Sequence, residues 1–550
     1  MSKLAALLAG FAVLTVTAAS AASAAPWSSS VPFTNTVVSS PVAGGGYPVP
    51  PGATRPDPGT CGPQQLNSNH SESWLAVKPG TEDIVGVSKF FICKWSTFYD
   101  FHLGSYTIQN GAAVATNEVQ GYECTTVGTQ DMPPSWTNNT DPNADFDTKG
   151  RAYQTTLPFN AFWAGGMHPN GEIDVSYSDD MGRHWIKANG GVALDNTNNQ
   201  NSVTLGHVED KQWIAVNHIV GNVNQDHVYA MWTTFNGSNG NGKIMVSVSR
   251  DRGATFSKAV QLTTPSETTP GNTFVYPSIG SDGTVYVAFI GGFDLNKNRV
   301  GHVYVTKSVD DGRTWTPFVI AASPIENPTG TFANTNFRDG ILENFAASPS
   351  HPGHAYLTYE NWNPAAGTSD VYFTQTVDGG FTWSAPQQVN DDANTASSDQ
   401  FQPSVAANGD AVAVAFYDRR AACPNDASIL PAHRGQANSC IAVSLQAYRD
   451  TGSSSGAQPV GSNANISDFI WDPDQPGQKV DGISQYPCAG HNDPCPRGRG
   501  FIGDYFGLAI SGGNVYTLSV TTHYPQNTGG TAVYYQQQVL ATVLRSAFGL

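Results

Sequence analysis

The sequence predicts an all-β fold, a single seven-bladed β-propeller of four-stranded antiparallel blades. Two observations predict this fold. An alternating strand pattern recurs seven times over residues 66–550, and four of the copies share one turn motif. The composition agrees, because charged residues make up only 13% of the chain while it holds 56 Gly and 35 Pro. That balance is typical of short strands joined by turns, and it excludes a helical bundle or a coiled coil.

The first 25 residues read as a secretory signal peptide. They carry Lys3, an apolar run from Leu4 to Val16, and small residues that end in Ala22-Ser23-Ala24, an A-x-A cleavage pattern. The run is too short for a membrane anchor, and no later segment reaches the ~18 apolar residues of a membrane-spanning helix. We therefore expect a secreted, extracellular protein without a membrane span.

Residues 26–65 are rich in Thr, Ser, Pro and Gly and read as an extended lead-in. The seventh repeat shows two inner strands and then the segment Ala532–Leu544, with no motif turn between outer strands. An outer strand can therefore come from the other end of the chain, and we expect the stretch Phe33–Val42 to close the last blade. Closure of this kind removes free sheet edges.

A repeated pair of apolar strands predicts the two inner strands of each blade. A Gly- or Asp-containing turn leads from the first strand to a second apolar strand, as Asp282-Gly283 leads into Thr284–Phe289. The copies begin near Trp74, Ala144, Trp213, Ser278, Phe345, Ser404 and Gly507.

The outer half is expected from the motif S/T-x-D-x-G-x-T/H-W/F. Its aspartates are Asp180, Asp251, Asp310 and Asp378, spaced 71, 59 and 68 residues apart. The Asp carboxylate can accept backbone N–H groups, the Gly can adopt positive φ, and the aromatic ring can pack between sheets. We therefore assign these four aspartates a structural role.

These four segments resemble the Asp-box, or bacterial neuraminidase repeat, of the sialidase superfamily. The resemblance implies that the boxes lie away from the active site. It also implies an arginine cluster that clamps a carboxylate, a Tyr nucleophile activated by a Glu, and an Asp acid/base. Sialidase propellers usually have six blades, so a six-bladed sialidase-type ring is the alternative fold.

Strand order selects the face on which the chemistry is expected. If the first strand of each blade starts at the upper face, the boxes lie at the lower face, and residues that flank the inner strands crowd the upper mouth of the channel. Those before first strands are His70, Glu72, Asp141, Glu209, Asp210, Lys211, Tyr276, Arg338, Asp339, Glu343, Asp399, Gln402, Asp504 and Tyr505. Ends of second strands add Glu360, Trp362 and Tyr417-Asp418-Arg419-Arg420.

A sialidase-like exo-glycosidase acting on a terminal acidic sugar is the leading interpretation. The nucleophile could be Tyr417 or Tyr276, with Glu343 or Glu360 beside it, and Asp504 and Asp210 are the candidate acid/base groups. Arg338, Arg419 and Arg420 are expected to bind the sugar carboxylate, and Trp362 to stack on the sugar. A second interpretation of the arginines pairs Arg419 and Arg420 with Asp418, Asp426 and the neighbouring loop.

Two other functions fit the same residues. A polysaccharide lyase on uronate-containing glycans could use His70, Tyr417 and Lys211 as base and cation. A non-catalytic glycan- or protein-binding propeller would use the charges only to pair around the channel.

Cysteines, cofactors and partners complete the predictions. In an exported chain, Cys423 with Cys440 and Cys488 with Cys495 are expected to form disulfides that clip upper-face loops. Cys61, Cys93 and Cys124 then leave one thiol over. No cofactor is required, although the converging carboxylates could hold Ca²⁺. The net charge of −17 argues against nucleic acid, so we expect an extracellular glycan or glycoconjugate as partner and a monomer.

Overall fold

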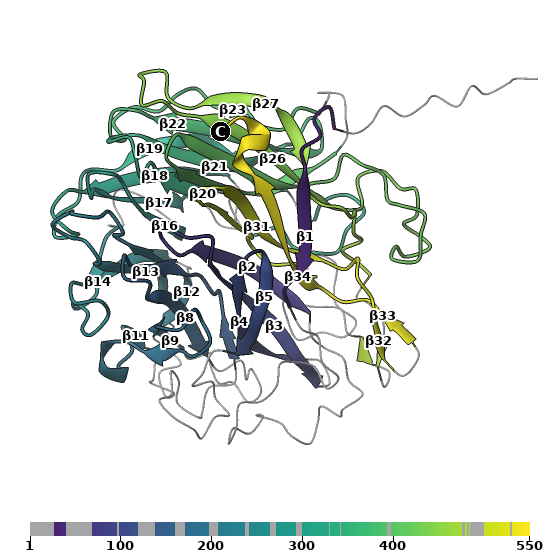
Figure 1. Cartoon of the computed structure of the whole chain (residues 1–550), viewed down its shortest axis with the longest axis horizontal. Coiled ribbons are helices and arrows are strands. Elements are labelled where there is room, and N and C mark those ends of the chain that lie inside the picture. The colour runs from purple at the N-terminus through teal and green to yellow at the C-terminus, as the bar shows by residue number, and fades with distance from the viewer. Residues whose placement is uncertain are drawn as a thin grey trace, which may run out of the picture.

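The computed structural model describes sixteen stretches of the chain, and its architecture is a ring of seven sheets (Figure 1). The described residues are 27–39, 69–95, 98–118, 138–159, 171–196, 207–236, 241–263, 271–292, 300–328, 331–340, 343–392, 398–475, 479–480, 483–484, 500–528 and 531–550. Their helices are the 3-10 turns η1 (Asn189–Gly191) and η2 (Arg545–Phe548), and none is long and apolar enough to cross a membrane. The predicted seven-bladed propeller is confirmed, and the six-bladed alternative is wrong.

The seven blades follow one another along the chain, each running from an inner to an outer strand. Blade one is β2 (His70–Val77), β3 (Ile84–Trp95), β4 (Phe98–Gln109) and β5 (Ala112–Glu118). Blade two has split inner and outer strands: β6 (Asn138–Thr140) and β7 (Asp145–Phe146), then β8 (Ala152–Phe159) and β9 (Glu172–Ser178), then β10 (Ile186–Lys187) and β11 (Asp195–Asn196). Blade three is β12 (His207–Val216), β13 (Val228–Asn236), β14 (Asn241–Ser249) and β15 (Val260–Gln261).

Blades four to six repeat the same order. Blade four is β16 (Thr273–Ile279), β17 (Val285–Gly291), β18 (Val300–Ser308) and β19 (Val319–Glu326). Blade five is β20 (Glu343–Ala347), β21 (Ala355–Asn363), β22 (Thr368–Thr376) and β23 (Gln387–Gln388). Blade six is β24 (Gln400–Asn408), β25 (Ala411–Asp418), β26 (Ala442–Arg449) and β27 (Gln458–Asn465).

Blade seven is built from both ends of the chain. Its inner strands are β30 (Gly507–Ile510) and β31 (Asn514–Thr521), followed by β34 (Gln537–Leu544). The outer strand is β1 (Phe33–Val37), which pairs with β34 from Phe33↔Val543 to Val37↔Val539 (Figure 1). Two small hairpins lie outside the blades: β28 (Lys479–Val480) with β29 (Ile483–Ser484), and β32 (Gln526–Thr528) with β33 (Thr531–Val533).

The four box turns share one hydrogen-bond pattern. One carboxylate oxygen of each Asp accepts the backbone N–H of the residue four positions later, at 2.8–3.0 Å. The aromatic residue that ends a box packs between neighbouring blades, as Trp185 does with full burial. These contacts give the four aspartates a structural role. Their turns lie at the end of the blades opposite the starts of the first strands.

A β-bulge near the start of the inner strand recurs around the ring. Register shifts lie between Ser71 and Trp74, Asp210 and Trp213, Thr273 and Tyr276, and Phe401 and Ser404. The residues inside these shifts include Glu72, Lys211, Phe274 and Gln402, with φ between 45° and 57°, and Asp141 in blade two has φ 56°. Left-handed backbone is uncommon for residues other than Gly and concentrates at functional sites.

Candidate functional site

Seven charged side chains meet at the upper end of the channel, and we call them the mouth cluster. Lys211 is at its centre: its Nζ lies 2.9 Å from Oδ2 of Asp141, 2.7 Å from Oδ2 of Asp504 and 3.8 Å from Oδ1 of Asp210. The bulge in β12 places Lys211 against blades two and seven at once. The members are Glu72, Lys89, Asp141, Asp210, Lys211, Arg338 and Asp504.

Arg338 approaches the cluster from the loop before blade five. Its Nε and Nη2 donate to the two carboxylate oxygens of Asp504, at 3.2 and 2.7 Å. Its backbone N–H donates to Gly500 O at 2.8 Å, and its guanidinium lies 4.8 Å from the ring centre of Phe501. The approach requires Gly340, because a Cβ there would lie 2.2 Å from Oδ1 of Asp504.

Blades one and two close the other side of the cluster. Lys89 Nζ lies 2.9 Å from Oε2 of Glu72 and donates to the Thr140 hydroxyl at 3.0 Å. Thr140 in turn donates to Oδ1 of Asp141 at 2.6 Å. Lys89 and Thr140 were missed at the sequence level, because Lys89 lies in the middle of the long strand β3 and reaches the mouth by pairing with Ser71 at the start of β2.

The carboxyl groups around Lys211 differ in acidity. Partial burial raises the pKa of Asp210 to about 6; the charges of Asp141 and Asp504 add to the rise, and Lys211 opposes it. Burial also acts on Asp504, but the charges of Arg338 and Lys211 outweigh it and lower the pKa of that carboxyl. The pKa of Asp141 is lowered in the same way, against burial, by Lys211 and Lys89. When neighbouring carboxyl groups differ in pKa in this way, the one with the raised pKa can donate a proton, and those with lowered pKa values stay ionised. Here Asp210 is the first kind, and Asp504 and Asp141 are the second.

An aromatic layer lies beneath the mouth cluster. The ring of Trp213 is 4.6 Å from that of Trp74, 4.6 Å from Tyr276 and 5.1 Å from Tyr505, all edge-on. Burial and then the charge of Glu343 raise the pKa of Tyr276, so Tyr276 and Glu343 are the Tyr–Glu combination that the structure brings together. Below the layer, a cavity of about 520 Å³ runs between the inner strands, and both alanines such as Ala76 and Ala215 and the aromatic residues Trp74, Trp213 and Tyr276 line it.

Tyr417 does not reach the mouth. It is fully buried between blades six and seven, 4.6 Å from the ring of Phe506, and its hydroxyl oxygen accepts the N–H of Val520 at 3.2 Å. The alternation of β25 turns its side chain toward the neighbouring blade instead of the channel.

Arg419 and Arg420 do not join Arg338 in a clamp either. Arg419 is fully buried. Its Nη1 lies 2.9 Å from Asp399, and its Nη2 donates to Ala333 O at 2.8 Å and to Asn438 O. Burial lowers the pKa of Arg419 to about 10.

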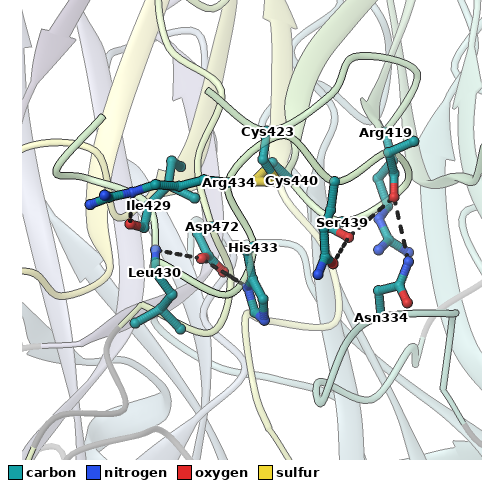
Figure 2. Close-up of a disulfide and its surroundings, with 12 residues drawn as sticks. Asn334, Arg419, Cys423, Ile429, Leu430, His433, Arg434, Ser439, Cys440 and Asp472 are labelled. Carbon is teal, nitrogen blue, oxygen red and sulfur yellow. Dashed lines mark hydrogen bonds and ion pairs between the residues drawn. A yellow bond between two sulfur atoms is a disulfide. The ribbon is translucent and has the colours of Figure 1, made fainter. Parts of the chain in front are cut away.

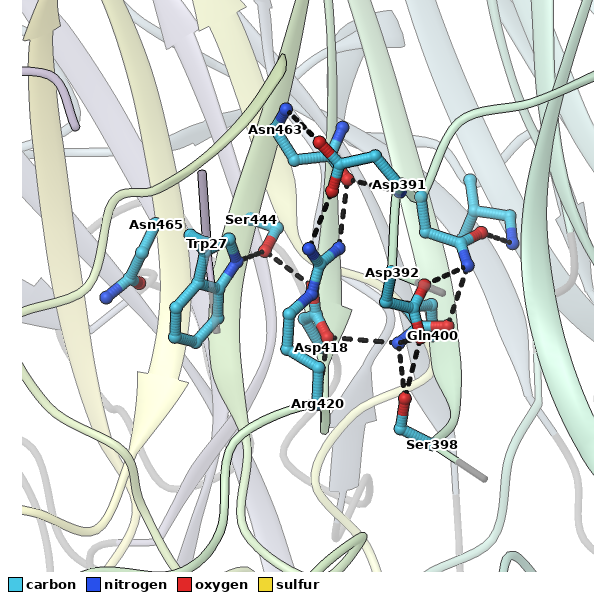
Figure 3. A network of polar contacts seen from close by, with 12 residues as sticks. Trp27, Asp391, Asp392, Ser398, Gln400, Asp418, Arg420, Ser444, Asn463 and Asn465 are labelled. Carbon is cyan, nitrogen blue, oxygen red and sulfur yellow. Dashed lines mark hydrogen bonds and ion pairs between the residues drawn. The ribbon is translucent and has the colours of Figure 1, made fainter. Parts of the chain in front are cut away.

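Arg420 turns to the outer part of blade six. It pairs with Asp418 at 2.7 Å and Asp391 at 2.6 Å and donates to Asn463 at 2.9 Å (Figure 3). Both arginines are therefore ion-paired, as the second interpretation expected. Arg419 pairs with Asp399, and Arg420 pairs with Asp418 and Asp391, whereas Asp426 is not a partner of either.

The remaining candidates lie beside the cluster or away from it. Glu360 is buried next to Asp339, and the Asp339 carboxyl in turn is affected by the charge of Asp504. Trp362 packs against Phe332, with ring centres 6.5 Å apart. His70 is 1% exposed, and its Nδ1 lies 3.1 Å from Gln536 O at the edge of blade seven.

The predicted Cys423–Cys440 disulfide is confirmed, with an S–S distance of 2.04 Å (Figure 2). Two residues of the loop that it closes bind Asp472 from outside the loop: the N–H of Leu430 donates to Asp472 at 3.1 Å, and Nδ1 of His433 lies 2.9 Å from it. The predicted Cys488–Cys495 bond lies outside the described residues. Among the described side chains, no three or more His, Cys, Asp or Glu gather as a metal site.

No protein-family model and no curated protein matches the sequence. Among solved structures, the Hadza microbial sialidase Hz136 matches with a TM-score of 0.40 and 14% identity, over 63% of this chain and 63% of that chain. A leech intramolecular trans-sialidase matches with a TM-score of 0.40 and 10% identity, over 64% and 65% of the two chains. The polysaccharide lyase Uly1 matches with a TM-score of 0.40 and 10% identity, over 84% and 88%. The matched regions of the two sialidases cover less than two thirds of their chains.

Proposed function

We propose that the protein is a secreted carbohydrate-active enzyme, a glycoside hydrolase that binds an acidic sugar at the mouth cluster. One observation carries the proposal: Arg338 and Asp210 are 35% and 36% exposed, whereas Lys211, Asp141 and Asp504 beneath them are 10% exposed or less. A cation and a carboxyl with a raised pKa thus share the open end of a buried ion network, as anion binding and proton transfer require.

In this proposal, Arg338 binds the carboxylate of the sugar. Asp504 accepts hydrogen bonds from Nε and Nη2 of Arg338. Within the described residues Nη1 makes no hydrogen bond, so it can donate a charge-assisted hydrogen bond to the substrate. The bidentate contact fixes the plane of the guanidinium, so little rotamer freedom is lost on binding.

In this proposal, Asp210 is the general acid. A carboxyl with a pKa of about 6 is protonated often enough near neutral pH to donate to the leaving glycosidic oxygen. Lys211 and Asp504 act as positioning residues for it. Tyr276, in the layer directly below, is the candidate nucleophile; because burial and then Glu343 raise its pKa, it would act only if Glu343 accepts the phenol proton as the bond to the sugar forms.

The geometry favours hydrolysis over elimination. Of the three residues expected to serve a lyase, Tyr417 lies in the core and His70 is buried against Gln536. Lys211, the expected cation, keeps its charge because Asp141, Asp210 and Asp504 raise its pKa against burial, but neither expected base belongs to the mouth cluster.

The test is a screen of chromogenic acidic glycosides and acidic polysaccharides with the secreted protein. We expect new reducing ends and no ultraviolet-absorbing unsaturated product. Asp210→Asn should lower kcat by about 10²–10⁴-fold, the usual contribution of a general acid, and kcat/KM of the parent should fall above about pH 6. Arg338→Ala should raise KM by about 10–100-fold, with partial recovery in Arg338→Lys.

Matched controls lie in the box turns, on the opposite face. Asp179→Asn and Arg313→Ala remove the same charges from sites that are 60% and 61% exposed, and both should leave turnover unchanged. An unsaturated product would establish a lyase, and binding of glycans without turnover of any would establish a binding protein. Either result would overturn the proposal.

A further inference from the structure

Two buried carboxyl groups outside the mouth cluster face each other without a counter-ion. Asp339, in the loop before blade five, is 5% exposed, and Glu360, on β21, is fully buried. The two carboxyls lie within hydrogen-bonding reach of each other. In the described part of the chain, no Lys, Arg or His forms an ion pair with either. Two carboxylates held this way repel each other and have lost their hydration.

Oxygen atoms without hydrogen-bond partners lie in the same place. Oδ1 of Asp339 has none among the described residues, and neither has Oε1 of Gln402, a side chain that is 2% exposed. The position of Gln402 is fixed, because its backbone N–H donates to Oε2 of Glu360 at 2.8 Å and its Nε2 donates to Gly503 O at 2.9 Å. The Gln402 side chain also hydrogen-bonds the carboxyl of Asp339, so its unpartnered amide oxygen belongs to a residue that contacts both carboxyl groups. Buried polar atoms are rarely left in this state.

We propose that Asp339, Glu360 and Gln402 bind a hard divalent cation, Ca²⁺, between blades five and six. The donors are oxygen atoms only, two charged and one amide, which is the ligand type that Ca²⁺ takes. Backbone carbonyls and water complete its coordination in other proteins. The charge of the ion balances that of the two carboxylates, and the absence of thiol and imidazole donors disfavours Zn²⁺ and Cu⁺.

The cation would join three parts of the mouth. Asp339 directly follows Arg338, Glu360 belongs to blade five, and Gln402 is the bulge residue of blade six. Through Gly503, Gln402 also contacts the segment that carries Asp504. An ion at this point ties the Arg338 loop to the blades and stabilises the folded chain, since the three donors converge only after folding.

The experiment is a Ca²⁺ titration of the full-length secreted protein after removal of metals by a chelator. Isothermal titration should show saturable binding, and the Tm should rise with Ca²⁺ concentration. Glu360→Gln and Asp339→Asn, made singly, should each weaken Ca²⁺ binding by at least about tenfold, because a neutral amide replaces a charged ligand. Two single variants are used so that a folding failure of one leaves the other to decide.

Asp174→Asn is the matched control. Asp174 is also a fully buried carboxyl beside a second one, Glu172, but this pair has a counter-ion, because Nζ of Lys187 lies 2.8 Å from Asp174 and 3.2 Å from Glu172. This variant should bind Ca²⁺ as the parent does. The proposal is overturned if the stripped parent protein does not bind Ca²⁺, or if both Glu360→Gln and Asp339→Asn bind it with unchanged affinity. It is also overturned if the two variants are more stable than the parent in saturating Ca²⁺, which would identify a carboxyl pair that shares a proton.

Discussion

Glu72 is a buried acid on the border between the charged and the aromatic layers of the channel. It is fully buried, with φ 51°, and Nζ of Lys89 lies 2.9 Å from its Oε2. Burial, and then the charge of Asp141, raise its pKa to about 7 in spite of Lys89 and Lys211. The folded protein therefore holds this proton more tightly than the unfolded chain, whose Glu titrates near 4.5.

We predict that Glu72→Gln flattens the pH dependence of stability. For an acid with a raised pKa, the stability it contributes is present at low pH and is lost as pH rises from about 4.5 to about 7. Urea unfolding at pH 5 and pH 7 measures the loss, which should be smaller in the variant than in the parent. Glu326→Gln, at the end of β19 and away from the cluster, should behave as the parent. An equal loss in Glu72→Gln and parent would refute the assignment.

At the scale of the blades, tyrosines on second strands bind carboxylates of the next blade. Tyr229 donates to Asp311 at 2.6 Å, Tyr356 to Asp450 at 2.7 Å, and Tyr516 to Glu82 at 2.6 Å. The last of these contacts links blade seven to blade one across the point where the ring closes. Burial opposes ionisation of all three carboxyls, but the hydrogen bonds prevail and their pKa values are lowered.

We predict that Tyr356→Phe lowers the free energy of unfolding by about 1.5–3 kcal/mol, the range for a hydrogen bond to a charged group. His354, with Nδ1 2.7 Å from Asp450, still serves the carboxylate, so the variant should fold. Chemical denaturation measures the change. Tyr304→Phe is the control, because Tyr304 stacks on Phe289 and no protein hydrogen bond to its hydroxyl is present in the described part. Equal stability of the two variants would contradict the prediction.

The whole ring is closed by its N-terminal segment. Beyond the β1 pairing, Trp27 donates to the Ser444 hydroxyl at 2.7 Å, and its ring lies 5.6 Å from the guanidinium of Arg420 (Figure 3). Asn35 donates to Ile466 O at 3.0 Å. One segment thus covers the edge of β34 and contacts blade six.

We predict that replacement of residues 33–37 by Gly and Ser, at constant length, lowers the Tm and promotes association. The replacement weakens the pairing with β34 and offers its hydrogen-bonding groups to other chains. Thermal unfolding and light scattering measure the two effects. Trp27→Ala removes a neighbouring contact but keeps the β1 pairing, so it should lower the Tm without promoting association. An unchanged Tm in the Gly/Ser variant would show that closure does not depend on β1.

The sequence determined the fold because the repeat is local. Alternation of apolar residues, the box turns and the seven strand pairs are each read within a few tens of residues, and blades add by stacking on their neighbours. It also determined that Arg338, Asp210, Lys211 and Asp504 belong to one mouth, since strand order places them at one end of the blades. The box aspartates and Cys423–Cys440 were found from short-range patterns as well.

Only the tertiary structure decided which members of that set meet. The alternation at Tyr417, Arg419 and Arg420 left open which side faces the channel, and the answer depended on partners such as Asp399 and Asp391, 20 and 29 residues away in the sequence. The bulges that orient Glu72, Lys211 and Gln402 leave no composition mark, because these residues are not Gly. Lys89 enters the mouth through contacts with Glu72 in its own blade and Thr140 in the next, and such contacts exist only once the ring has closed.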